Sequence, residues 1–308
     1  MRNLIFNILV LGAALLYGGA VSGAAPKNYA IVVGIGDYPE ESGWSRIHGD
    51  RDVSLVVDML ERNGFLKENI ICLENDGATK TAIENAFYSL QSCLGQGDRV
   101  YVHFSGHGQQ VTDLDGDEED GKDEAFIPYD ACSKYVQGKY EGEKHIVDDE
   151  LNAWLSDMAD AVGKKGLVIV VIDACHSGDA TRGIGNGTEE VVVRGTADLF
   201  EIPADVSENR AESSENMQGG KPAKLKRKIS WICLSACKSY QNNNEYRSDD
   251  GYYGRLSWAM NEVLMPGMNL DELISGIKSE FSVLPLPQGP PQTPDFVYPR
   301  DRSFVRVF

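Results

Sequence analysis

Two short segments of this chain carry side chains that could together form a cysteine–histidine pair. In one, an apolar run ends in Ser-Gly-His107-Gly108, and in the other, an apolar run ends in Asp-Ala-Cys175-His-Ser-Gly. Ligands of parallel sheets lie outside the carboxyl ends of the strands, so two such ends can bring an imidazole to a thiol. A thiolate is a strong nucleophile, and a neighbouring imidazole can take up its proton. The two segments therefore predict nucleophilic catalysis by Cys175 with His107.

The surroundings of this pair predict further roles. The backbone N–H groups of Gly108 and Cys175 are candidates for an oxyanion hole. His176, which follows the nucleophile, is a competing base that we interpret as a structural residue, and His103 lies inside the apolar run and is expected to be a core histidine. A zinc site on these histidines is an alternative, although no ligand-spacing signature accompanies it.

Both motifs resemble those of caspase-fold cysteine peptidases, and most closely those of metacaspases, which are of the peptidase family C14 type. The resemblance extends over about residues 28–293 and includes a Gln292-Thr-Pro sequence near the end. It implies that Cys175 is the nucleophile of an endopeptidase that forms an acyl-enzyme, with His107 as the proton-transfer partner. The chain departs from the family pattern in having Ala rather than a second Cys before Cys175, and in low similarity over residues 181–228.

The same resemblance implies a pocket for a basic substrate side chain. Asp52, Asp173 and Ser105 match the residues that line the S1 pocket of metacaspases. Two carboxylates select Arg or Lys at P1 through charge-assisted hydrogen bonds. Two alternatives stay open, namely that Asp52 interacts only with a helix N-terminus and that Asp173 has only a hydrogen-bonding role at its strand end.

An acidic segment, residues 113–124, separates the two motifs and contains eight Asp or Glu residues. It lacks the residue order of an EF-hand. The resemblance instead implies three calcium ligands, Asp123, Asp148 and Asp149. A fourth ligand position falls at Arg182, which cannot bind calcium, and Asp179 is a candidate replacement. We expect no required cofactor, with calcium as an activator; the alternative is a solvated acidic loop, with Asp148 capping its helix.

Residues 181–228 have little hydrophobic periodicity and are predicted to form a flexible linker and processing region. Exposed, flexible segments are the usual sites of nicking, so a peptidase selective for basic residues could cut itself there. The candidate positions are Lys224, Lys226, Arg227 and Lys228, with Arg182 and Arg194 further upstream. The alternative interpretation is a solvated run of charge.

The remaining chain alternates between strand and helix patterns. Strands are predicted over 29–35, 69–74, 99–104, 167–172 and 229–234, and helices over 50–62, 79–93, 148–161, 255–264 and 270–281. This order implies an α/β chain with a parallel sheet covered by helices on both faces. With the resemblance, it predicts a caspase-like α/β/α sandwich around a central, mostly parallel six-stranded sheet. The Pro-rich residues 285–299 are expected to run over the surface.

Residues 1–25 predict a secretory signal peptide, because a basic start, a short apolar stretch and small residues follow one another. The alternative is a membrane anchor, for which the apolar stretch is short. Residues 26–308 are then expected to form one peptidase domain. The expected location is secreted or periplasmic, with no membrane association after removal of the signal.

The net charge of −18 disfavours nucleic acid as a partner, because phosphate binding requires clustered positive charge. Protein or peptide substrates with a basic P1 residue are the expected partners, and the resemblance implies a monomer. Three other functions stay open: a non-catalytic caspase-like domain that binds peptides or scaffolds an assembly, a clostripain-like or gingipain-like peptidase, and another thiol enzyme on the same scaffold.

Overall fold

A central six-stranded sheet organises the protein, as a computed structural model describes it. The model describes residues 25–116, 118, 120–175, 192–203, 206, 230–285, 291–302 and 305–308. The strand order is β11-β8-β7-β3-β1-β2. The bounds are β1 Asn28–Gly34, β2 Ile70–Glu74, β3 Arg99–Ser105, β7 Leu167–Asp173, β8 Ile232–Ser235 and β11 Asp295–Val297. All neighbours pair in parallel except β11, which is antiparallel to β8. The predicted fold class is confirmed.

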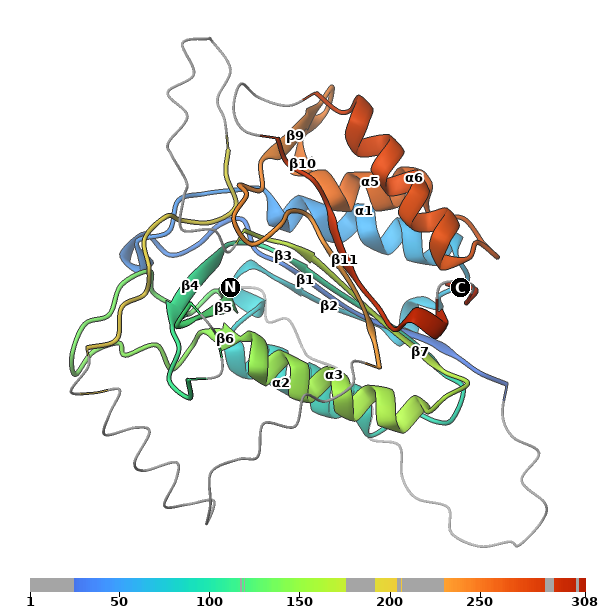
Figure 1. Ribbon diagram of the computed structural model, residues 1–308, viewed down its shortest axis with the longest axis horizontal. Coiled ribbons are helices and arrows are strands. Elements are labelled where there is room, and N and C mark those ends of the chain that lie inside the picture. Colours follow the sequence, from blue (N-terminus) through green and yellow to red (C-terminus); the bar gives the residue numbers. More distant parts are fainter. Residues whose placement is uncertain are drawn as a thin grey trace, which may run out of the picture.

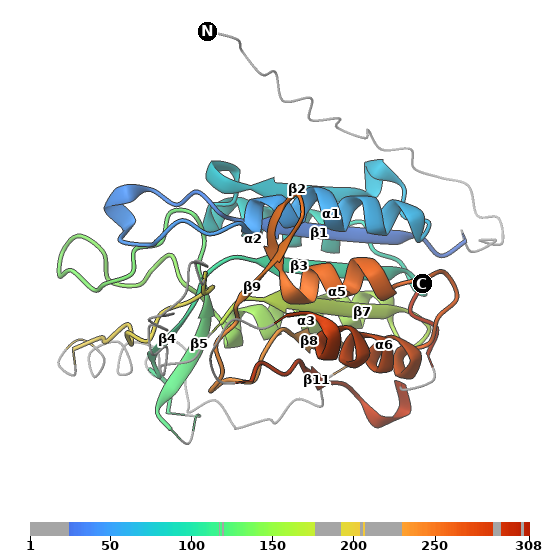
Figure 2. The same ribbon diagram turned by 90° about the horizontal axis from the view of Figure 1, so that it is seen from above.

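Helices cover both faces of this sheet, which explains why its central strands are mostly apolar. α2 (Lys80–Gln91) and α3 (Asp148–Val162) lie on one face, and α1 (Gly49–Arg62), α5 (Arg255–Val263) and α6 (Leu270–Val283) lie on the other (Figure 1). Each face has its own apolar core. Figure 2 shows α1, α5 and α6 side by side across the sheet.

The helix ends follow the local sequence, with one correction. The side chain of Thr79 accepts a hydrogen bond from the Ala82 N–H at 3.2 Å, as a predicted N-cap of α2 should. Asp148 was expected to cap α3, but the N-cap is Val147, and Asp148 is the first helical residue. The Asp148 carboxylate is therefore not used as a helix cap.

Several elements were not predicted. A three-stranded antiparallel sheet consists of β4 (Gly108–Thr112), β5 (Lys122–Phe126) and β6 (Ile146–Val147), and a hairpin consists of β9 (Glu245–Ser248) and β10 (Gly251–Gly254). Short 3-10 helices span Glu40–Ser42, Lys67–Asn69, Asn75–Gly77 and Arg300–Arg302. Within residues 285–299, which were expected to run over the surface, β11 was not predicted; it pairs with β8 at the edge of the central sheet, with Phe296 opposite Leu234.

Some predictions fall outside the part of the chain that the structure describes. These are most of the predicted signal peptide and the basic run at residues 224–228. Among the described helices, none combines the length and the apolar character needed to cross a membrane.

Candidate active site

The two predicted catalytic motifs meet at one edge of the sheet because their strands are neighbours. Ser105, the last residue of β3, lies opposite Asp173, the last residue of β7. His107 and Cys175 each follow two residues later. The register of two parallel strands thus brings both turns to the same place.

Two aromatic side chains and one hydrogen bond orient His107. Its ring stacks on Trp44 at 4.9 Å between centroids and lies 5.1 Å from the ring of Tyr38. Nε2 lies 2.8 Å from the Ser45 carbonyl oxygen, so Nε2 carries the proton and donates it. Nδ1 is buried and has no hydrogen-bond partner. Burial lowers the pKa of His107 to about 4, so the ring is neutral and Nδ1 carries no proton near pH 7.

The backbone N–H of Cys175 is hydrogen-bonded to a carbonyl oxygen from a later part of the same chain, that of Arg194. The Cys175 N–H donates to the Arg194 carbonyl oxygen at 2.8 Å, and the buried thiol donates to the Gln241 carbonyl oxygen at 3.2 Å. Gly195 forms a parallel bridge with Gly108. A Cβ atom added to Gly195 would lie 2.9 Å from the Cβ of Cys175. The Arg194–Gly195 peptide bond therefore lies against the predicted nucleophile, with its carbonyl on a predicted oxyanion donor.

The three predicted S1 residues converge on the side chain of Arg194, which is completely buried. Its Nη1 donates to Asp52 Oδ2 at 2.7 Å and to the hydroxyl of Ser105. Nη1 also lies 3.8 Å from Asp173 Oδ1. Ser105 in turn donates to Asp52 at 2.5 Å. The structure thus brings Asp52, Ser105 and Asp173 together around one guanidinium group.

A third carboxylate, which the sequence reasoning missed, completes this pocket. Arg194 Nε donates to Glu245 Oε1 at 3.1 Å. Glu245 also accepts the His48 N–H at 2.8 Å and contacts His48 Nδ1 at 2.6 Å. No local signal pointed to Glu245, because it lies ten residues after the end of β8 and only long-range pairing brings it to the pocket.

The guanidinium of Arg194 offsets part of the negative charge of this pocket. Burial raises the pKa of Asp52 to about 6, although Arg194 acts in the opposite direction. Burial also opposes ionisation of Asp173, but Arg194 and donors from Asn243 and Ser257 bring its pKa below the ordinary value. Those donors, the Asn243 amide and the N–H and hydroxyl of Ser257, each lie 2.7 Å from the Asp173 oxygens.

The residues before Arg194 bind in the extended form of a peptide ligand. The Arg194 N–H donates to the Asn243 carbonyl oxygen at 2.9 Å, and the Glu245 N–H donates to the Val192 carbonyl oxygen at 2.9 Å. Val193 and Asn244 form an antiparallel bridge. Main-chain pairing of this kind is how many proteins bind extended peptides.

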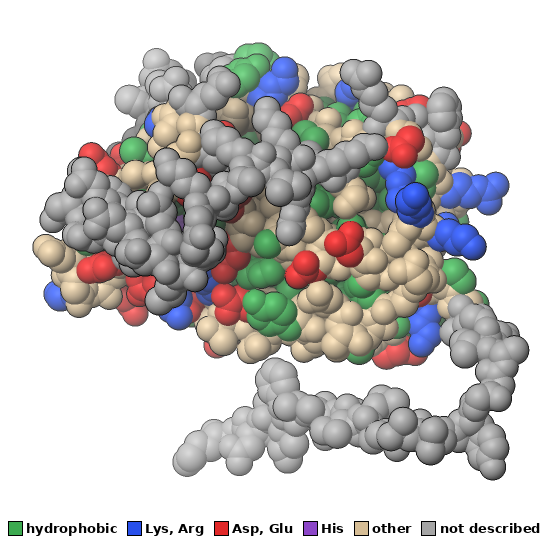
Figure 3. Space-filling view, turned by 60° about the horizontal axis from the view of Figure 1, so that its bottom comes forward, with side chains coloured by type: hydrophobic (Ala, Val, Ile, Leu, Met, Phe, Trp, Pro, Cys, Tyr) green, Lys and Arg blue, Asp and Glu red, His purple; other side chains and the backbone are tan. Residues whose placement is uncertain are grey.

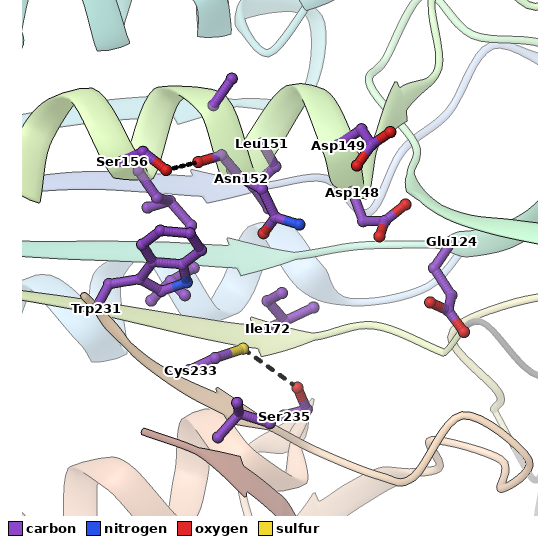
Figure 4. Close-up of a pocket in the computed structure, with 14 residues that line it drawn as sticks. Glu124, Asp148, Asp149, Leu151, Asn152, Ser156, Ile172, Trp231, Cys233 and Ser235 are labelled. Carbon is purple, nitrogen blue, oxygen red and sulfur yellow. Dashed lines mark hydrogen bonds between the residues drawn. The ribbon is translucent and has the colours of Figure 1, made fainter. Parts of the chain in front are cut away.

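The predicted calcium ligands lie elsewhere, at an acidic corner that we define as Asp123, Glu124, Asp148 and Asp149. Glu124, Asp148 and Asp149 line one end of a cavity of about 500 Å³ (Figure 4). Burial and the neighbouring acids raise the pKa of Asp123 to about 8 and that of Asp148 to about 7. Asp148 Oδ1 is buried without a hydrogen-bond partner.

The acidic corner offers the hard oxygen ligands that calcium prefers. In the part of the chain that the structure describes, however, no three His, Cys, Asp or Glu side chains converge closely enough to hold a metal ion. The remaining ligand positions, Asp179 and Arg182, lie outside the described residues.

Figure 3 shows acidic side chains spread over one face of the molecule, with Lys and Arg mostly toward its right end.

Of the two other histidines considered from the sequence, the structure describes His103. His103 is fully buried, with Tyr101 and Ser257 each 3.1 Å from its ring nitrogens, as expected for a core histidine. His176 lies outside the described residues.

With this geometry in place, residues 29–182, half of the chain, match the model of the metacaspase, peptidase C14 domain family. The chain belongs to the metacaspase family. It is accordingly a cysteine-type endopeptidase.

Two fungal metacaspases illustrate the relationship. Metacaspase-1B of Aspergillus oryzae is 27% identical over 299 residues, covering 87% of this chain and 68% of that protein. Metacaspase-1 of Eremothecium gossypii is 37% identical over 129 residues, which cover 40% of this chain and only 26% of that protein.

A solved structure supports the fold alone. Protein GSU0716 from Geobacter sulfurreducens has a TM-score of 0.57 and 22% sequence identity, covering 91% of this chain and 98% of that chain.

Proposed function

We propose that this metacaspase cleaves polypeptides after Arg, and less readily after Lys, with Cys175 as nucleophile and His107 as proton-transfer partner. The observation that carries the proposal is Arg194, whose side chain lies among three carboxylates while its carbonyl oxygen accepts from the Cys175 N–H. A planar guanidinium can use several acceptors at once, whereas a Lys ammonium is a point charge on a flexible stem.

We propose the following chemistry. The Cys175 thiol passes its proton to Nδ1 of His107, and the thiolate attacks the P1 carbonyl carbon. The oxyanion that forms is stabilised by the Cys175 N–H and, in our proposal, by the Gly108 N–H. The imidazolium of His107 then protonates the leaving amine. Water, deprotonated by His107, releases the acyl group from Cys175.

We further propose that the first substrate is the chain itself, at the Arg194–Gly195 bond. Its position against Cys175 supports this bond over the basic run at residues 224–228, which lies outside the described residues. Until that bond is cut, residues 192–195 exclude other substrates from the pocket. Arg194 is one of the upstream positions predicted from the sequence.

The test compares the wild type with Cys175→Ala and Arg194→Ala. Mass spectrometry of the purified wild type should find a fragment that begins at Gly195, and neither variant should yield it. Processed wild type should hydrolyse fluorogenic peptides with Arg at P1 faster than those with Lys, and those with Asp hardly at all. Absence of any Cys175-dependent hydrolysis, with or without calcium, would rule out the proposed function, and faster cleavage after Asp would rule out the pocket assignment.

The remaining parts of the proposal are export, a monomeric state and activation by calcium. Calcium would bind at the acidic corner, where the partnerless Asp148 oxygen and the raised pKa values of Asp123 and Asp148 support a cation. The peptide cleavage itself requires no cofactor. Isothermal titration with calcium and the N-terminal sequence of the exported protein test two of these parts directly.

A further inference from the structure

The chain beyond Arg194 also lies in a formed site. Gly195 and Phe200 make parallel bridges with Gly108 and Val111 of β4, so residues 195–202 follow the free edge of the small β4-β5-β6 sheet. Three hydrogen bonds fix this arrangement. The Phe200 N–H donates to the Gln110 carbonyl oxygen at 2.8 Å, and the Thr112 N–H donates to the Phe200 carbonyl oxygen at 3.1 Å. The Ile202 N–H donates to the Thr112 hydroxyl at 3.0 Å.

A buried glutamine of β4, Gln109, also binds this segment through its side chain. Gln109 is fully buried, and its amide donates to the Asp198 carbonyl oxygen at 2.9 Å and to the Ser133 carbonyl oxygen at 3.0 Å. Its own oxygen lies 3.1 Å from His145 Nε2. Burial lowers the pKa of His145 to about 3, so the ring is neutral and Nε2 is the donor while Nδ1 accepts from Tyr140. These contacts bind main-chain atoms and are independent of the ligand's sequence.

One side chain of the segment enters a pocket of its own. Phe200 is fully buried. The centroid of its ring lies 4.4 Å from that of His145, 5.8 Å from that of Tyr140 and 6.3 Å from that of Tyr135. A Cβ atom added to Gly142 would lie 2.9 Å from the Phe200 ring, so the wall fits the ring closely. The preceding residue, Leu199, is 37% exposed. Of these two neighbouring residues, Phe200 thus enters the aromatic pocket and Leu199 does not.

We infer that this edge is the enzyme's binding site for the part of a substrate that follows the scissile bond. The occupant would be a polypeptide with an aromatic residue six positions after the P1 arginine, which is the place of Phe200 relative to Arg194. The inference rests on the proposed function, because covalent continuity with Arg194 is what makes residues 195–202 the model of a bound substrate. Main-chain pairing to β4 supplies affinity, and the pocket supplies selectivity.

Binding can be tested without catalysis and without the S1 pocket. The protein is the full chain with Cys175→Ala, which prevents cutting, and Phe200→Asp, which releases its own segment because a carboxylate cannot enter an apolar pocket unpaired. The probe is a labelled, N-acetylated peptide of residues 195–203, and affinity is measured by fluorescence anisotropy. A peptide with Ala in place of Phe200 should bind at least about tenfold more weakly, as expected for loss of a buried aromatic side chain. A peptide with Ala in place of the exposed Leu199 is the matched control and should bind within about twofold.

Equal affinity of the Phe and Ala peptides, or no binding of either at millimolar concentration, would overturn the inference. If Phe200→Asp shows no cooperative unfolding transition, and so is not folded, Phe200→Ala replaces it in the same measurement. The probe lacks Arg194, so its result is independent of the S1 pocket. Hydrolysis of a short substrate that ends at P1 tests the proposed function separately.

Discussion

The proposed S1 pocket and the acidic corner both gather carboxylates, yet the pKa values of the two groups are shifted differently. Asp52 is fully buried, with a pKa of about 6, whereas Asp123, only partly buried, has a pKa of about 8. The pKa values of Asp173 and Glu245 even lie below their ordinary values. The difference is the guanidinium of Arg194, which lies within the first group. A set of buried acids becomes a selective pocket when the ligand itself brings the missing positive charge.

The strongest way to break this comparison is to remove one acid from the pocket. Asp52→Asn should lower kcat/KM for peptides with Arg at P1 by about 100-fold or more, because an incompletely paired buried charge costs about 3–5 kcal/mol. Asp58→Asn, which changes an exposed residue of the same helix, should leave kcat/KM unchanged. A modest, equal loss in both variants would mean that Asp52 does not contact the substrate.

The pH dependence sharpens the same point. Arginine binding requires ionised Asp52, so kcat/KM for Arg peptides should fall about tenfold per unit as the pH falls below a limb near or above 6. In the empty pocket, Asp52 lacks the lowering influence of Arg194, which moves this limb upward. His107, with a pKa of about 4, does not account for it. The limb should disappear in Asp52→Asn, and its persistence there would assign it to another group.

Removal of one carboxylate from the acidic corner should be favourable, because it should raise the stability of the fold. In chelator at pH 8, Asp148→Asn should stabilise the fold by roughly 1–2 kcal/mol, after allowance for solvent screening of a partly buried group. The reason is that the folded-state pKa lies above the unfolded one, so the folded state of the wild type loses stability as the pH rises from about 4 to 7. Thermal melts at pH 5 and pH 8 would show this gain shrinking at the lower pH. Destabilisation at pH 8 would contradict the assigned repulsion.

The smallest expected effect is that of calcium itself. If a cation completes the acidic corner as Arg194 completes the S1 pocket, millimolar calcium should raise the melting temperature of Cys175→Ala by about 2–4 °C. The additional Asp148→Asn change should abolish the shift. An equal shift in both proteins would place the calcium elsewhere.

The fold was predictable because its strands and helices carry strong local patterns. The run from Val168 to Ile172 and the capping by Thr79 are local signals, and both predicted elements formed. β11 was missed because three residues within a Pro-rich stretch carry no periodicity, and only pairing with β8 makes them a strand. The short strands of the β4-β5-β6 sheet were missed for the same reason.

The candidate site divides in the same way. His107, Cys175, Asp52, Ser105 and Asp173 could be singled out from motifs, since all lie at or near the ends of predicted elements. Glu245 and Phe200 could not be, because their contacts come from segments without periodicity that long-range pairing brings to the site. Arg194 was visible as a basic residue in a linker, but nothing local indicated that its own pocket would hold it.

The order of strands determines what a cut after Arg194 would leave behind. That bond lies between β7 and β8, which are neighbours within the sheet, so the product would be two polypeptides sharing one continuous sheet. The first would carry Asp52, His107 and Cys175, and the second would carry Glu245 and Asn243. Neither piece alone would contain a complete pocket. Maturation would therefore create an obligate two-chain enzyme, in which separation of the pieces destroys specificity and sheet together.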